Sequence, residues 1–215
     1  MSFGYEKKDL LYSPGHFRIE DQERLHAFID LHGFGVLLSN SSDGELKSSW
    51  LPLMLSSDRL SLEGHLARAN PQWQDWESSP STSVLFLGPH AYISPTAYST
   101  QKSVPTWNYA TVRVDGEISI VEESASAVEI VSKLVAKHEQ NRDPKWEFNS
   151  DSEFSKGLLK AIVCFRLQIK SIYGSFKMSQ NKSDLDRGRV IEYLRQTGSL
   201  TDQDCAAFME GLDES

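Results

Sequence analysis

The residues best suited to bind a phosphate follow a predicted strand. Apolar and polar residues alternate over residues 60–66, which predicts a β-strand. Asn70 and Pro71 are typical of a helix start, with an N-cap residue followed by proline at the first helical position. A helix start offers free backbone N–H groups, and His65 and Arg68 add donors beside it, so the segment suits a phosphate. The alternative is that Arg68 pairs with a surface carboxylate and Asn70 only caps the helix.

Three further stretches are rich in small, aromatic and amide residues. In residues 88–98, two prolines predict a stiff loop whose polar and aromatic side chains form a ligand wall or pack on the fold. In residues 104–109, Trp107 and Tyr109 face a planar ring or cover the core. Residues 176–181 offer a cation and hydrogen-bonding side chains, as a phosphate or a polar ring edge requires, or form a solvated loop.

Motifs of the common enzyme classes are missing from the sequence. It contains no Gly-x-Ser-x-Gly elbow, Gly-x-Gly-x-x-Gly turn, Walker loop or His-Glu-x-x-His pair. The six histidines show no i, i+4 spacing, so no metal site is predicted. Cys164 could act as a nucleophile only if a base approached it, and no catalytic residue is assigned.

The composition limits the partners and the compartment. Thirty acidic and twenty-two basic residues give a formal charge of −8, the wrong sign for a broad polyanion-binding face, so nucleic acid is expected only through a local patch or a partner. The two cysteines form no disulfide framework, which favours a reducing compartment. There is no signal-peptide pattern and no apolar run near the about 20 residues of a membrane helix, so we expect a soluble cytoplasmic protein with no membrane contact.

Strand and turn patterns dominate the 215 residues. A hairpin at Asp43-Gly44 joins predicted strands, and a second is predicted at Asp115-Gly116. The strands are predicted at residues 34–38, 45–55, 60–66, 83–87, 104–114, 117–121 and 162–170, and the helices within residues 19–30, from 71, within 128–138 and 154–159, and beyond 184. Gly88-Pro89 is expected to end the fourth strand. Helices inserted between hairpins, rather than alternating with strands, favour a small antiparallel β-barrel with added helices.

Six blocks of sequence, taken together and in order, resemble one family. They are Leu11-Tyr-Ser-Pro-Gly-His-Phe17, Gly64-His-Leu-Ala-Arg-Ala-Asn-Pro-Gln-Trp73, Gly88-Pro-His-Ala-Tyr-Ile-Ser-Pro95, Val104-Pro-Thr-Trp-Asn-Tyr109, His138-Glu139 and Lys177-Met-Ser-Gln-Asn181. The blocks are similar to those of the PaiB family of FMN-binding negative transcriptional regulators, from about Leu11 to Arg195. The resemblance implies a mainly β fold with added helices, a split β-barrel that binds FMN, usually at a homodimer interface. It places the FMN-binding domain at residues 11–195, and beyond it this chain is expected to carry an extension at 1–10 and a helical tail at 196–215.

The resemblance also implies roles for single residues. The block with His65, Arg68, Asn70 and Trp73 would hold the phosphate. The phosphate site would be completed, or the ring edge bound, by Lys177, Ser179 and Gln180. The ring itself would be approached by Thr106, Trp107 and Asn108. Backbone would be offered to the ring face by Leu51, Pro52 and Leu53. Trp50 departs from the family pattern, which usually has histidine there, so the ring environment differs.

Two classes of function follow from the resemblance. The first is a flavin-binding regulator or sensor, in which FMN changes a dimer surface that meets a partner. The second is an FMN-dependent oxidoreductase that reduces a small substrate with NADH or NADPH. A third is an FMN store without turnover. The sequence shows neither a basic DNA-binding surface nor catalytic donors, so whether the protein is an enzyme stays open.

Overall fold

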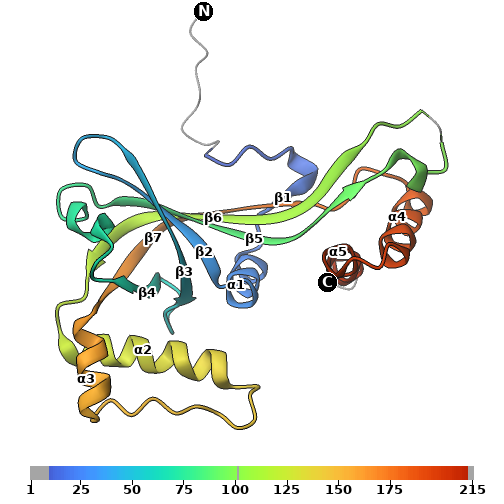
Figure 1. Cartoon of the computed structure of the whole chain (residues 1–215). Helices are drawn as coiled ribbons and strands as arrows, with labels where there is room; N and C mark the ends of the chain where they lie inside the picture. The colour runs from blue at the N-terminus through green and yellow to red at the C-terminus, as the bar shows by residue number, and fades with distance from the viewer. Residues whose placement is uncertain (1–9, 101, 213–215) are drawn as a thin grey trace, which may run out of the picture. The chain divides into compact units, whose positions relative to one another are not determined.

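The strands of the computed structural model form a closed barrel with added helices (Figure 1). The structure describes residues 10–100 and 102–212. Within these residues, seven strands follow the order β1-β7-β4-β3-β2-β5-β6, and β7 also pairs with β6, which closes the sheet. The pairs β2–β3, β2–β5, β3–β4, β4–β7 and β1–β7 are antiparallel. The predicted mainly β barrel with helices is therefore confirmed.

The elements have the following bounds. The strands are β1 (Arg18–Ile19), β2 (Phe34–Asn40), β3 (Leu46–Leu55), β4 (Ser61–Ala67), β5 (Ser81–Ile93), β6 (Thr106–Ile120) and β7 (Ile162–Lys177). The α-helices are α1 (Gln22–Leu31), α2 (Ser124–Glu139), α3 (Glu153–Lys160), α4 (Asp184–Gln196) and α5 (Leu200–Gly211). The 3₁₀ segments are η1 (Gly15–Phe17), η2 (Pro71–Asp75) and η3 (Pro95–Ala97).

The chain divides into two compact units, and each is described by itself. Unit 1 comprises Met1–Leu25, Leu87–Val112 and Tyr173–Ser215. Unit 2 comprises His26–Phe86 and Arg113–Ile172. The strands β5, β6 and β7 contribute residues to both units. The domain division predicted from the sequence, at residues 10 and 195, stays a prediction.

In unit 2, the β4 strand is buried on both faces. Leu62 and Leu66 are buried in the hydrophobic core, as the alternating pattern requires. On the other face, Glu63 lies opposite Met54 of β3, and the helix α2 packs on β3 and β4. Ile130 and Leu134 of α2 form a buried cluster there with Met54 and Cys164. A polar strand residue such as Glu63 is therefore covered by a helix rather than by water.

The second predicted hairpin, at Asp115-Gly116, is wrong. β6 runs without a break from Thr106 to Ile120. A Cβ atom on Gly116 would lie 2.2 Å from the carbonyl oxygen of Gln168 in β7, so glycine is needed there for a close backbone approach. Asp115 is also not a turn residue, since its carboxylate accepts hydrogen bonds from Arg113 and Ser83.

Other boundaries differ from the prediction as well. Gly88-Pro89 does not end a strand, because β5 continues to Ile93, and the expected loop at residues 88–98 is strand followed by η3. β5 pairs with β2 over residues 82–85, so proline at position 89 interrupts none of those hydrogen bonds. The helix expected after Asn70 is the five-residue 3₁₀ segment η2, and the last strand extends beyond Lys170 to Lys177.

Candidate functional site

One group of the predicted cofactor residues surrounds a cavity in unit 1. Thr106 and Asn108 lie on β6, Lys177 ends β7, and Ser179 lies in the turn that follows. The cavity has a volume of about 130 Å³ and is lined by Tyr98, Val104, Thr106, Asn108, Lys177, Ser179, Asn181 and Lys182, which we call the cradle. Four residues of the cradle were not among the predicted cofactor residues: Tyr98, Val104, Asn181 and Lys182.

Two ammonium groups give the cradle a positive charge. The Nζ atom of Lys177 donates to Thr106 Oγ1 at 2.5 Å and to the carbonyl oxygen of Trp107 at 2.6 Å. An ammonium has three N–H groups, so one of them stays available to a ligand. Burial lowers the pKa of the Lys177 ammonium, and the charge of Lys182 lowers it further. Lys182 itself lies with Nζ 4.7 Å from the centroid of the Tyr98 ring.

The turn after β7 is held in an unusual conformation. Ser179 has φ +64°, in the left-handed region that residues other than glycine rarely adopt. Its hydroxyl donates to Asn108 Oδ1 at 3.1 Å, and Asn108 is only 1% exposed. The Gln180 side chain closes the same turn, since it accepts from the Met178 N–H and donates to the Phe176 carbonyl oxygen. Gln180 therefore shapes the turn with both ends of its amide.

Tyr98 places a buried hydroxyl in the wall of the cradle. The residue is 5% exposed, and within the described chain its hydroxyl makes no hydrogen bond. Burial raises the pKa of this hydroxyl, and the nearby Ser179 hydroxyl opposes the change, although the two groups do not reach hydrogen-bond geometry. A buried hydroxyl without a partner is costly, so it is suited to meet a polar ligand atom.

The Trp107 side chain lies on the opposite face of β6 from Thr106 and Asn108, because successive strand residues alternate. It is 54% exposed and meets Tyr92 edge-on, with 5.9 Å between ring centroids. His90 lies beside the same ring at 6.5 Å. Trp107 is therefore part of an exposed aromatic group and not of the cradle.

A second group of predicted residues lies in unit 2, around Arg68. Its guanidinium donates from Nε to the carbonyl oxygen of Lys160 and from an Nη atom to that of Ile162, both at 2.8 Å. The guanidinium carbon lies 5.8 Å from the Trp73 ring, and the Trp73 indole N–H donates to the Arg68 carbonyl oxygen. Backbone carbonyl oxygens and an aromatic ring hold this arginine in place. Its observed partners therefore differ from the surface carboxylate that the alternative from the sequence expected.

His65 is half-buried on the face of β4 that α2 covers. Its backbone lies opposite Cys164 of β7, and in the described chain its Nδ1 atom has no hydrogen-bond partner. Burial lowers the pKa of the His65 imidazole, which favours the neutral form. Burial also raises the pKa of the Cys164 thiol to about 11, so this cysteine is unsuited to act as a nucleophile.

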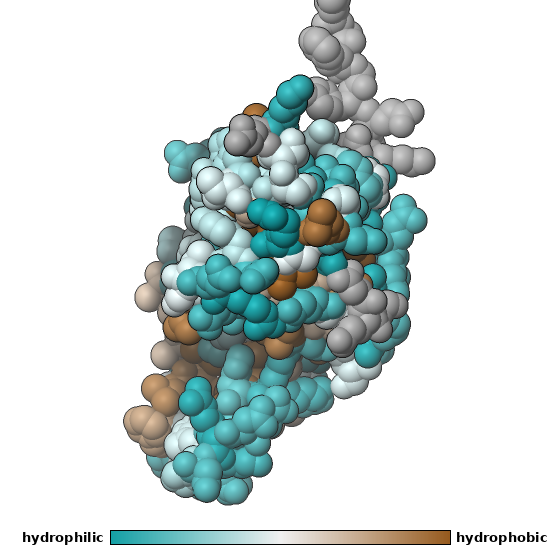
Figure 2. All heavy atoms as spheres, turned by 90° about the vertical axis from the view of Figure 1, so that its right-hand side faces the viewer, coloured by the Kyte–Doolittle hydropathy of each residue, from teal (hydrophilic) through white to brown (hydrophobic). Residues whose placement is uncertain are grey.

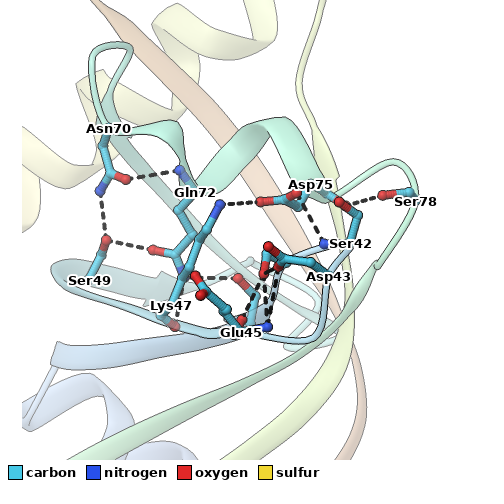
Figure 3. Close-up of polar contacts among 11 residues, drawn as sticks. Ser42, Asp43, Glu45, Lys47, Ser49, Asn70, Gln72, Asp75 and Ser78 are labelled. Carbon is cyan, nitrogen blue, oxygen red and sulfur yellow. Dashed lines mark hydrogen bonds and ion pairs between the residues drawn. The ribbon is translucent and has the colours of Figure 1, made fainter.

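Asn70 belongs to a polar network that ties η2 to the β2–β3 hairpin (Figure 3). Its side-chain oxygen accepts from the Gln72 N–H, which confirms the predicted N-cap, and its amide donates to Ser49. Gln72 is buried and contacts β2 and β3 through its own amide. Lys47 and Asp75 pair at 2.6 Å at the end of the network. Asn70 therefore has a structural role in fixing η2.

The segment Leu51-Pro52-Leu53 lies in the middle of β3. Leu51 and Leu53 are buried, and the Leu53 N–H donates to the Gly33 carbonyl oxygen at 2.7 Å. Trp50 before them is 61% exposed and stacks on Phe34, with 5.9 Å between ring centroids. This part of β3 thus exposes an aromatic pair.

The chain matches the model of a protein family described as "Putative FMN-binding domain" over residues 11–171. It is 33% identical over 204 residues to "Protease synthase and sporulation protein PAI 2" of Bacillus subtilis, with 93% of this chain and 97% of that protein covered. The family description names FMN, so the predicted cofactor is confirmed at the level of the family.

Solved structures share the fold at low sequence identity. The flavocytochrome Anf3 from Azotobacter vinelandii has a TM-score of 0.59 and 12% identity, covering 80% of this chain and 75% of its own. The FAD and heme binding protein from Mycobacterium smegmatis has a TM-score of 0.58 and 12% identity, covering 80% of this chain and 79% of its own. The likeness supports the split β-barrel fold.

Proposed function

Because the chain belongs to the PaiB family of FMN-binding proteins, we propose that it is a flavin-linked sensor that holds FMN through the cradle. The observation that carries this proposal is the donor set of the cradle. Lys177 and Lys182 supply positive charge, and the buried Tyr98 hydroxyl lacks a partner in the described chain. Such a set fits an acceptor-rich part of a cofactor, and FMN when bound would supply one- and two-electron redox chemistry.

The residues of the chain would bind and orient the cofactor. The Lys177 ammonium is fixed by two short hydrogen bonds, so little side-chain entropy is lost when its third N–H meets a ligand. In unit 2, the Arg68 fork is likewise fixed by two carbonyl oxygens, and its outer N–H groups are suited to a phosphate. Held in this way, both cations are preorganised for a negatively charged or acceptor-rich ligand.

If the protein is a regulator, we expect it to act through a partner protein rather than by direct contact with DNA. The helices α4 and α5 pack on each other and are joined by a short turn at Gly198, but α5 carries Asp202, Asp204 and Glu210 and no lysine or arginine. Hydrophilic side chains predominate on the face of Figure 2, which looks onto the side of Figure 1 where α4 and α5 are drawn. An acidic helix cannot supply the phosphate contacts on which DNA affinity depends.

A homodimer is supported by the exposed aromatic pair Phe34 and Trp50. Exposed, stacked aromatics are enriched in protein interfaces, and both rings are 61% exposed. Light scattering is expected to give a mass of about twice the chain mass of 24.2 kDa, and Trp50→Glu is expected to reduce it. A mass of 24.2 kDa with FMN bound would contradict the dimer.

The proposed compartment is the cytoplasm. Cys164 and Cys205 are free and buried, which supports a reducing environment. Within residues 10–100 and 102–212, no helix has both the length and the apolar character needed to cross a bilayer.

A fluorescence titration of FMN tests the proposed function. We expect the parent protein to bind FMN and Lys177→Met to weaken binding by about tenfold or more, since a charge-assisted hydrogen bond is lost. Lys170→Met is the matched control, because Lys170 forms an exposed pair with Glu117 at 3.3 Å. Failure of the parent protein to bind FMN would overturn the proposal.

Anaerobic mixing of the FMN-bound protein with NADH or NADPH then distinguishes a sensor from an oxidoreductase. A sensor is expected to leave the flavin absorbance unchanged over many minutes. Rapid bleaching of that absorbance would favour the oxidoreductase instead.

A further inference from the structure

The C-terminal helix α5 reaches the cradle through one buried sulfur atom. Met209 is 0% exposed, and its Sδ atom accepts a hydrogen bond from Asn108 Nδ2 at 3.4 Å. The same helix places Cys205 Sγ 3.8 Å from Met178 Sδ, and Phe208 meets Phe176 edge-on at 5.3 Å. Met178 and Phe176 flank Lys177 in the chain, so α5 supports the strand end that forms the cradle.

The thioether of Met209 fixes the orientation of the Asn108 side-chain amide. A thioether sulfur accepts hydrogen bonds and cannot donate them, so the amide NH₂ must face it. The amide oxygen of Asn108 then faces Ser179, whose hydroxyl donates to it at 3.1 Å. The single hydroxyl proton of Ser179 is therefore used, and toward the cavity Ser179 offers only the lone pairs of its oxygen.

This arrangement gives the cradle both donors and an acceptor. Lys177 and Lys182 can only donate, whereas Ser179 accepts. A phosphate dianion has acceptors alone and would leave the Ser179 lone pairs facing negative oxygen atoms. The imide edge of an isoalloxazine ring carries an N–H and two carbonyl oxygens, so it can use both the donors and the acceptor. The volume of about 130 Å³ lies below the range of complete ligand sites and fits one ring edge, not the whole cofactor.

We infer that the cradle recognises the imide edge of the flavin ring and not its phosphate, with Met209 as a positioning residue that acts through Asn108 on Ser179. The inference rests on the proposed function, because it assigns one part of FMN to one part of the site. It also gives α5 a role, since Met209 on this helix fixes whether Ser179 donates or accepts a hydrogen bond in the cradle.

Riboflavin and FMN distinguish the two ends of the cofactor, because they share the ring and differ in the phosphate. If the cradle binds the imide edge, Lys177→Met weakens both flavins by the same factor, about tenfold or more. Ser179→Ala removes the acceptor, so it weakens both flavins equally and abolishes the preference of the parent protein for riboflavin over N3-methylriboflavin. Weakening of FMN alone would assign the cradle to the phosphate and overturn the inference.

Met209→Leu tests the positioning role at nearly constant volume. We expect it to lower the preference for riboflavin over N3-methylriboflavin, because the Asn108 amide is no longer held in one orientation. Met54→Leu is the matched control, since Met54 is also buried but packs with Ile130, Leu134 and Cys164 in unit 2. Circular dichroism and melting curves check that both variants fold.

A preference that stays unchanged in Met209→Leu would remove the positioning role. If the parent protein bound neither flavin, the proposed function itself would fail. If it bound both but Lys177→Met and Ser179→Ala had no effect on either, only the assignment of the cradle would fail.

Discussion

The Arg68 guanidinium caps the end of α3 with a hydrogen bond of 2.8 Å from Nε to the carbonyl oxygen of Lys160. The last carbonyl groups of a helix lack partners within the helix, so an arginine from the turn after β4 stabilises this end. The same side chain is the proposed phosphate ligand in unit 2. The structural role predicts an effect on the stability of the apo protein, and the role as a phosphate ligand predicts an effect on FMN affinity.

Arg68→Ala is expected to change both stability and affinity. Loss of the two carbonyl hydrogen bonds lowers the free energy of unfolding of the apo protein by about 1–3 kcal/mol. Loss of the outer N–H groups weakens FMN binding by about one to two decades. Melting curves of the apo protein and a fluorescence titration measure the two effects. Lys156→Ala, which removes an exposed pair with Glu153, serves as control, and unchanged FMN affinity would leave Arg68 a structural role alone.

His65 is expected to make the apo protein less stable in acid. Burial lowers the pKa of its imidazole below the ordinary value of 6.5, so the unfolded chain binds the proton first. Stability is therefore complete above the unfolded pKa and is lost as the pH falls through the interval down to the folded pKa. Urea unfolding of the parent and of His65→Gln between about pH 8 and pH 5 measures the difference. Equal pH dependence in both proteins would contradict it.

Two Asp-Gly pairs show how far the sequence predicts this fold. Asp43-Gly44 and Asp115-Gly116 give the same local signal for a hairpin. Gly44 has φ +88° and does make the turn, whereas Gly116 lies inside β6 because the β7 backbone passes close to it. Local chemistry predicts the first turn correctly, but only the tertiary approach of a distant strand explains the second.

Gly116→Ala is expected to destabilise the barrel. The added Cβ would lie 2.2 Å from the Gln168 carbonyl oxygen and 2.5 Å from Leu167 Cδ2, so two strands must move apart, at a cost of about 1–3 kcal/mol or more. Gly157→Ala in α3 is the matched control, since no atom lies within 4 Å and alanine favours helix by about 0.5–1 kcal/mol. Denaturant unfolding measures both. A harmless Gly116→Ala would contradict the close approach.

The candidate site was predicted in part for a similar reason. The blocks that resemble the family supplied Lys177 and Ser179, which do line one cavity. Tyr98 and Lys182 also line it but were not among the predicted cofactor residues, and Tyr98 was expected only in a loop with a ligand wall as one alternative, since no local pattern joins it to Lys177. Met209 was missed because a methionine on a helix is usually a core residue, and only the Asn108 amide beside it reveals a polar role.

The ion pair between Glu63 and Arg166 allows the cost of a buried carboxylate in unit 2 to be measured. It is 2% exposed beneath α2, with Oε1 accepting from Arg166 Nε at 2.7 Å and Oε2 without a partner in the described chain. Arg166→Met leaves a buried carboxylate unpaired and is expected to cost about 3 kcal/mol, reduced by solvent that reaches the partly exposed Arg166 position. The double variant Glu63→Met with Arg166→Met removes both charges and is expected to recover most of that loss.

Urea unfolding of the parent, both single variants and the double variant closes this thermodynamic cycle. Arg195→Met is the control, because Arg195 pairs with Glu210 at an exposed site where such a pair is worth about 0–1 kcal/mol. A double variant no more stable than Arg166→Met would mean that the charge of Glu63 is not the cause. Recovery would show that the unpaired charge of Glu63, which lies in the same strand as His65, causes the loss in Arg166→Met.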